Sequence, residues 1–256
     1  PDLPLSNTQI YGRSRTSVIH PDSNGTSVIE FDCPELTLTS GLVLYRHFLS
    51  NVSTWRIELF NEPGLRGDRV YDSGRQECVF TKSLGDLDWL VDRLVASTFD
   101  SWPHKFSQMW FEGVFHQSGR ITIIDKEARD NVHEIDRIYL GRVFKPTFNF
   151  SYGHEHAWQS PDAAIRTAAG SQFASQRTLT RRLSFALDYL SDLERPHLSS
   201  AIQRAGMHQD FFISMFPGWG GQKEIDYAMS AKFTELPTVT GTTFNNFASS
   251  ITVTEA

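Results

Sequence analysis

Short stretches of alternating apolar and polar residues recur along the chain and predict β-strands. In residues 55–60, Trp55, Ile57 and Leu59 fall on one face of such a strand, because side chains two positions apart point the same way. The same reasoning predicts further strands at residues 26–32, 42–49, 119–125, 135–143, 211–216, 225–236 and 249–255.

Two segments have apolar residues at helical spacing instead. The first is residues 83–97 and the second is residues 191–205. The second begins with a capping box of Ser191 and Glu194, and Gly206 ends it, since glycine readily adopts the conformation that closes a helix. This helix is expected to bury one stripe, made of Leu198, Ala201, Ile202 and Ala205.

A third amphipathic segment, residues 177–190, fits two descriptions. Several of its apolar residues lie three or four positions apart, as in a helix, but most lie on odd positions, which favours a long strand. We expect the strand, with an apolar face made of Leu179, Leu183, Phe185, Leu187 and Tyr189. Residues 163–174 before it predict a hairpin or a loop, and the glycine cluster at residues 218–221 predicts a loop.

The elements divide into two groups, and we place the boundary at Pro146. Residues 1–25 are polar and rich in turn formers, which predicts an irregular N-terminal arm. A first β domain then covers residues 26–146, and a second covers residues 147–256. The predicted fold class is mainly β with two helices (α+β), and a chain of 256 residues is long enough for a sizeable core.

Charge and cysteine content narrow the range of functions. The net charge is −6, whereas nucleic-acid-binding proteins usually carry a basic face that neutralises phosphates. No apolar run approaches the roughly 20 residues of a membrane span, and the first residues show no signal-peptide pattern. Cys33 and Cys78 are too few to form a disulfide framework. They indicate free thiols in a protein made in a reducing cytoplasm.

Residues with candidate chemistry are few. His154 and His156 lie two positions apart and could hold one metal ion from the same face of a strand. No third ligand stands at a standard spacing, so a solvated strand face is the preferred interpretation. The sequence has no phosphate-binding loop, dinucleotide fingerprint or serine-nucleophile elbow. We therefore expect no catalytic residues, no metal, no cofactor and no enzymatic activity.

Three tryptophans are candidates for stacking against sugars: Trp102, Trp110 and Trp158. A tryptophan in an exposed loop offers a flat apolar surface to a sugar ring. Tryptophan is more often an anchor of the core, because its large apolar body favours burial. The two interpretations differ in whether these side chains are exposed.

Five short runs carry a resemblance to a known family: residues 55–60 (WRIELF), 70–74 (VYDSG), 121–125 (ITIID), 138–142 (IYLGR) and 251–255 (ITVTE). With the order of the predicted elements, they make the chain resemble the distal or minor tail proteins of long-tailed bacteriophages. The resemblance implies a galactose-binding-like jelly roll in the first half. In the second half it implies a tail-tube-like β-sandwich with a flanking helix.

The resemblance also implies a structural role in the virion. The protein would be assembled in the bacterial cytoplasm and would form a ring, a hexamer or a trimer, that joins the tail tube to the distal tip or baseplate. Its partners would be the tail tube, hub and tape-measure proteins, and a host surface glycan would be a further ligand. The alternative is a carbohydrate-binding, lectin-like protein or accessory module.

Overall fold

The computed structural model describes residues 3–10, 15–78, 105–160, 164–166, 172–174, 178–219 and 221–256, with the backbone alone at residues 164–166, 172–174 and 221–222. The predicted helix at residues 83–97 lies outside these ranges, as does Trp102. Across these ranges the protein is mainly β: 55% of the described residues lie in strands, which form antiparallel sheets, and two helices accompany them. The fold class predicted from the alternation is therefore confirmed.

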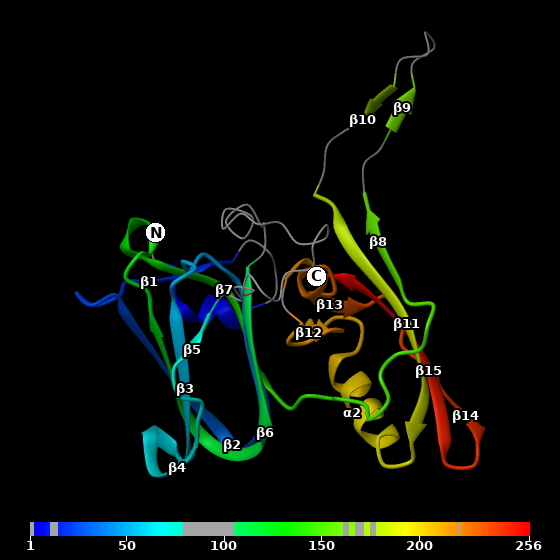
Figure 1. The fold of residues 1–256 in the computed structure, drawn as a ribbon, viewed down its shortest axis with the longest axis horizontal. Coiled ribbons are helices and arrows are strands. Elements are labelled where there is room, and N and C mark those ends of the chain that lie inside the picture. The colour runs from blue at the N-terminus through cyan, green and yellow to red at the C-terminus, as the bar shows by residue number, and fades with distance from the viewer. Residues whose placement is uncertain are drawn as a thin grey trace. The chain divides into compact units, whose positions relative to one another are not determined.

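The chain forms two compact units (Figure 1). Unit 1 comprises Pro1–Val143 and Phe216–Asp226, and unit 2 comprises Phe144–Met215 and Tyr227–Ala256. The segment Phe216–Asp226 includes α3 (Gly221–Asp226), whose buried Glu224 accepts a hydrogen bond from the Gln108 side chain.

Unit 1 contains one antiparallel sheet with the strand order β1-β7-β2-β6-β3-β4, and β5 also pairs with β3. Short 3-10 turns lie at Leu5–Gln9, Pro63–Leu65 and Arg129–Asn131. The strands are β1 (Ser17–Ile19), β2 (Thr26–His47), β3 (Thr54–Glu62), β4 (Arg66–Asp72), β5 (Gln76–Glu77), β6 (Phe106–Ile124) and β7 (His133–Gly141).

The two long strands β2 and β6 bend this sheet back on itself. Their pairing is interrupted between Asp32 and Thr37, where Pro34 lies, and again between Thr39 and Gly41. Bulges of this kind bend a strand and are among the few places where a sheet accepts proline. One end of the β2–β6 pair therefore continues into β3, whereas the other end continues into β7. The sequence predicted two separate strands at residues 26–32 and 42–49, and the structure joins them.

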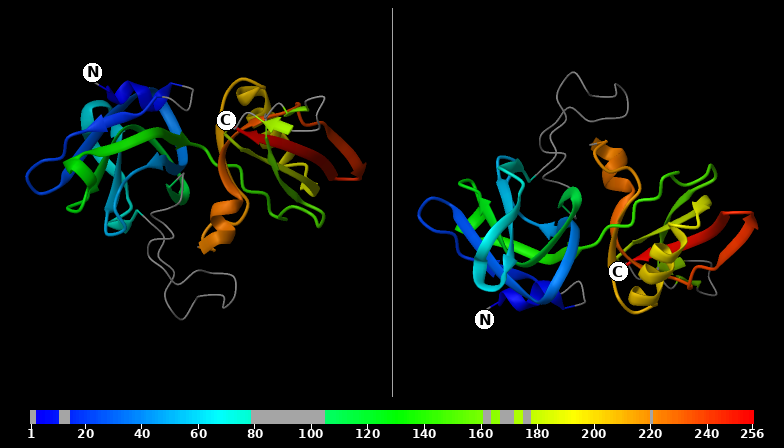
Figure 2. Two further views of the ribbon diagram at one scale, coloured as in Figure 1. Left: turned by 90° about the horizontal axis from the view of Figure 1, so that it is seen from above. Right: turned by 90° about the horizontal axis from the view of Figure 1, so that it is seen from below.

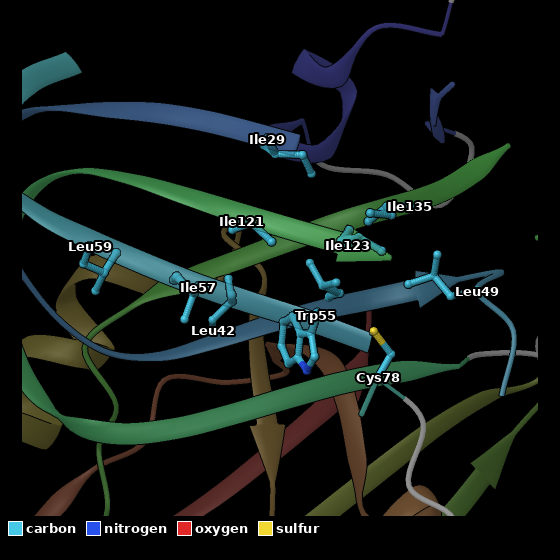
Figure 3. Packing of buried hydrophobic residues seen from close by; sticks show 11 residues of the cluster. Ile29, Leu42, Leu49, Trp55, Ile57, Leu59, Cys78, Ile121, Ile123 and Ile135 are labelled. Atoms are coloured by element: carbon cyan, nitrogen blue, oxygen red, sulfur yellow. The ribbon is translucent and has the colours of Figure 1, made fainter. Parts of the chain in front are cut away.

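The hydrophobic core of unit 1 fills the space inside the bent sheet (Figure 3). Trp55, Ile57 and Leu59 of β3 are all buried, as their alternation predicted. They pack in one cluster with residues of both long strands, of β7 and of the connecting segments, among them Ile29, Leu42, Leu49, Cys78, Ile121, Ile123 and Ile135.

Unit 1 differs from the expectation in two respects. A jelly roll has two sheets linked by Greek keys, whereas unit 1 has one continuous sheet, so the jelly-roll topology is not confirmed. The N-terminal segment, expected to be irregular, contributes β1 to the sheet, because Ser17 pairs with Ile135 of β7. Thr16 Oγ1 also donates a hydrogen bond of 2.6 Å to Asp136, which fixes the start of β1.

Unit 2 contains a second antiparallel sheet with the strand order β12-β13-β15-β11-β8. β14 pairs with the part of β15 that β13 does not reach. α2 lies against one face of it (Figure 1, Figure 2). The elements are β8 (Glu155–Gln159), β9 (Ala164–Arg166), β10 (Gln172–Ala174), β11 (Thr180–Ser191), α2 (Arg195–Ala205), β12 (Phe211–Ser214), β13 (Ala228–Phe233), β14 (Val239–Thr243) and β15 (Asn246–Glu255).

The segment at residues 177–190 forms the long strand β11, as expected, and not a helix. Its register with β15 shifts between Leu187 and Leu190. The shift reverses which residues point inward, so Leu190 is buried and Tyr189 is exposed. The prediction that Tyr189 belongs to the apolar face is wrong for this reason.

The capping residues of the second predicted helix form their bonds one turn before α2. Ser191 N donates to the Glu194 carboxylate (2.9 Å), and Glu194 N approaches Ser191 Oγ (3.3 Å). The regular helix begins at Arg195 and ends before Gly206. Leu198 and Ala205 are buried and Ile202 is half-buried, whereas Ala201 is exposed and does not belong to the buried stripe.

The strand predicted at residues 225–236 is wrong at its start. Ile225 lies in the last turn of α3, and the strand β13 begins only at Ala228. Gly221, expected in a loop, is the first residue of that helix.

Candidate functional site

The closest approach to a catalytic arrangement is a buried serine–histidine pair at one end of the unit 1 core. His47 Nε2 lies 2.7 Å from Ser107 Oγ. Leu49 N–H points at His47 Nδ1 (3.4 Å), and Ser107 Oγ donates to the carbonyl of Cys78. The hydrogen therefore sits on Nε2 and is donated to Ser107, which is the wrong direction for a base that activates a serine.

Burial fixes this pair in an inert state. Desolvation, with a smaller contribution from nearby Lys105 and against the opposing effect of Asp125, lowers the pKa of His47 to about 3. Desolvation also raises the pKa of the neighbouring Cys78 thiol to about 12. Both groups are therefore neutral at pH 7, and both are buried away from solvent. At neutral pH the pair therefore offers neither a charged imidazole nor an ionised thiol.

His154 and His156 lie in unit 2, where β8 begins. Both rings contact Tyr227, with centroid distances of 5.5 and 5.3 Å, and His154 also contacts Phe150 at 4.8 Å. Within the described ranges, no group of three or more metal-ligating residues is found. The two histidines thus share a face, as predicted, and pack there in an aromatic cluster.

The described tryptophans of the sugar hypothesis belong to different units. Trp110 in β6 lies across Gly41, because a Cβ on Gly41 would come within 2.7 Å of the indole. Trp158 in β8 is 57% exposed, and its ring lies 5.7 Å from that of His156. Sequence reasoning overlooked Trp219, which is exposed and stacks against the Lys223 ammonium at 3.8 Å.

A buried ion pair links the start of β11 to the end of β15 in the unit 2 sheet. Arg181 of β11 donates from Nη2 and Nε to the two carboxylate oxygens of Glu255 (3.0 and 3.2 Å) and from Nη1 to the carbonyl of Ala228 (3.1 Å). Both side chains are almost fully buried. The sequence did not predict this ion pair, because nothing local marks Glu255 as a partner of Arg181.

The feature best suited to contact another molecule is the ribbon formed by β9 and β10. Ala164 pairs with Ala174 and Arg166 with Gln172, and the two strands form a sheet of their own. The chain enters the ribbon after β8 and leaves it into β11, so the ribbon extends a pair of strands whose last partners are Gln159 and Thr180 (Figure 1). Two-stranded ribbons are at best marginally stable alone in water.

A second exposed feature lies at the other end of β11. The rings of Phe148 and Tyr189 stack edge to face at 6.0 Å, and both side chains are about three-fifths exposed, at 62% and 61%. Leu193 follows in the next turn and is also exposed. Thr147 N donates to Glu194 (2.5 Å), which holds Phe148 beside this turn. We refer to Phe148, Tyr189 and Leu193 as the aromatic patch.

None of the helices in the described part of the chain has the length and apolar character of a membrane span. No family model, curated protein or solved structure matches the chain.

Proposed function

We propose that the protein is a structural subunit of an oligomeric assembly. The ribbon β9–β10 carries this proposal, because within the described ranges its strands pair only with each other. Exposed strand edges offer unpaired backbone groups to another chain. A partner that supplies further strands or an apolar surface would stabilise the ribbon.

The aromatic patch supports the same proposal. Aromatic residues are enriched in the cores of protein interfaces, and grouped exposed apolar side chains mark interaction sites. The patch and the ribbon lie beyond opposite ends of β11, in which residues 180–189 alone span roughly 30 Å at the usual rise of a strand. A contact between the ribbon of one copy and the patch of the next is head-to-tail, and head-to-tail contacts produce rings or filaments.

The biological setting that we propose is the tail tip of a long-tailed bacteriophage, where a ring of this protein joins the tail tube to the distal tip. This part rests on the resemblance of the sequence. The partners would be the tail tube, hub and tape-measure proteins. The ring would contain six copies or another multiple of three.

A ribbon deletion tests the assembly. Because Gln159 and Thr180 are paired, a two-residue Asn-Gly turn can replace residues 160–179 and close the hairpin there. Mass photometry and cross-linking at high concentration are expected to show oligomers for the full chain and monomers for this variant. An unchanged distribution would contradict the role of the ribbon, and an unchanged unfolding midpoint serves as the folding control.

Electron microscopy of virions tests the setting. The tail-tip proposal expects a ring of this protein at the distal end of the tail tube. Its absence from particles, or a position in the head, would end that part of the proposal.

Carbohydrate binding is the second candidate, and exposed Trp158 favours it. An exposed indole beside a polar ring resembles the stacking platforms of sugar sites. A glycan array with the full chain and a Trp158→Ala variant separates the two candidates. A lectin would show saturable binding that the variant loses, whereas a purely structural subunit would bind no glycan.

A further inference from the structure

Residues 48–53, between β2 and β3, close one end of the unit 1 core. Ser50 donates to the Asp125 carboxylate through its backbone N (2.7 Å) and its Oγ (2.6 Å), and Phe48 N donates to the carbonyl of Glu134 (3.1 Å). Leu49 and Ser53 are completely buried. We call residues 48–53 the closing segment.

His47 precedes the closing segment and is bound to it in its neutral form. Its Nδ1 accepts the N–H of Leu49, and its Nε2–H is donated to Ser107. A second proton on Nδ1 would point at the N–H of Leu49, so that two donors would face each other. The imidazolium would also be a buried charge, which is costly without a bonded partner.

His133, at the start of β7, is the second histidine at this end of the core. It is completely buried, and neither ring nitrogen meets the geometry of a hydrogen bond. Desolvation lowers its pKa, while the nearby backbone and charge of Asp125 oppose this effect. A proton on His133 would therefore add a second buried charge.

The charged groups around these histidines do not compensate for such protons. Lys105 repels a charge on His47, and the attraction of Asp125 is weaker than the desolvation of either ring. Asp125 already accepts hydrogen bonds from Ser50 and from Glu127 N (3.0 Å). The Cys78 thiol stays neutral in acid because burial raises its pKa.

We propose that the closing segment is an acid-released latch: when His47 and His133 take up protons, residues 48–53 leave the core of unit 1. Both histidines are neutral in the closed state, and their released forms titrate near pH 6.5. The latch is therefore fully closed above pH 6.5 and is weakened as the pH falls below it. The inference does not depend on the proposed function.

The size of the effect follows from proton linkage. Each histidine that stays neutral in the closed state raises the opening equilibrium constant about tenfold for each pH unit below 6.5. Between pH 7.5 and pH 5, one such histidine accounts for about a 30-fold rise. The window ends at pH 5 because most carboxylates take up protons only below it.

Hydrogen exchange of the full chain, followed by mass spectrometry and corrected for intrinsic rates, measures the opening directly. We expect the protection of residues 48–53 to fall at least 30-fold between pH 7.5 and pH 5. In a His47→Gln variant, the fall in protection of residues 48–53 should be about 30-fold smaller. His20 is exposed, so His20→Gln is the matched control and should behave as the wild type.

Three results would overturn the latch. They are a pH-independent protection of residues 48–53, an equal fall in the His47→Gln variant, or an equal loss of protection at Ile57 in β3, which would mean that unit 1 unfolds as a whole. If His47→Gln does not fold, histidine ring signals of the wild type in NMR decide the matter. The latch expects the imidazole of His47 still neutral at pH 5.5, and titration of all nine histidines near pH 6.5 refutes it.

Discussion

The ring of Phe31 lies over the backbone of Gly119, its partner across β2 and β6. A Cβ on Gly119 would come within 2.4 Å of Phe31 Cζ and within 2.9 Å of a Leu59 methyl carbon. An aromatic ring that covers a glycine on the neighbouring strand allows a sheet to bend sharply while the strand stays paired.

A methyl group at this position should therefore destabilise unit 1. We expect Gly119→Ala to lower the free energy of unfolding by about 1–3 kcal/mol, because it overpacks the core. Gly141→Ala is the matched control, since a Cβ there meets nothing within 4 Å. Urea unfolding followed by intrinsic fluorescence measures both, and equal stabilities of the two variants would contradict the prediction.

The ion pair of Arg181 and Glu255 should be sensitive to the loss of one partner. Glu255→Gln leaves a buried guanidinium without its counter-charge, and we expect a loss of about 3–5 kcal/mol in the stability of unit 2. Replacing both residues by methionine should recover most of it. Asp192→Asn breaks an exposed pair with Arg195 and should cost no more than about 1 kcal/mol. A double-mutant cycle built from unfolding midpoints measures the coupling between Arg181 and Glu255.

Two residues of α2 should respond differently to truncation. Leu198 is buried, so Leu198→Ala is expected to cost about 2–5 kcal/mol. Ile202 is half-buried, so Ile202→Ala should lower the stability by less than Leu198→Ala does. Ala201→Ser, at an exposed position, should stay within about 0.5 kcal/mol of the wild type. Thermal unfolding ranks the three variants, and a Leu198→Ala variant as stable as Ala201→Ser would show that α2 does not anchor unit 2.

The two cysteines should differ in reactivity. The Cys78 thiol is buried and its pKa is raised to about 12, whereas Cys33 is partly exposed, and a hydrogen bond with Thr37 opposes the rise of its pKa by burial. Since the thiolate is the reactive form, an aromatic disulfide reagent at pH 8 should label Cys33 first and Cys78 only after unfolding. Peptide mapping identifies the labelled residue, and fast labelling of Cys78 in the native protein would be the contrary result.

The alternation of apolar residues predicted most strands, because a half-buried strand repeats every two residues. It worked for Trp55, Ile57 and Leu59, which are all buried. It failed at Tyr189, where a register shift exchanges the two faces. The alternation also predicted two strands where the structure has the single strand β2. A proline such as Pro34 usually interrupts a strand, and it is accommodated here at an irregularity in the pairing.

The candidate sites could be predicted only in part. The shared face of His154 and His156 followed from their spacing. The pairing of Arg181 with Glu255, or of His47 with Ser107, depends on which distant strands become neighbours. Sequence periodicity carries no information about such neighbours. The contact between His47 and Ser107 at one end of the unit 1 core could therefore not be predicted.

The long β2–β6 pairing has a kinetic consequence. Tyr45 and Phe106 are its partners nearest in sequence, while Thr26 and Ile124 are the most distant. Loop closure opposes contacts between distant residues, so pairing should start near Tyr45 and Phe106 and advance through the bulges toward Thr26. Folds dominated by such non-local pairing typically form in milliseconds to seconds. Until β6 docks, β2 is an unprotected edge, so refolding should lose more material to aggregation as the concentration rises.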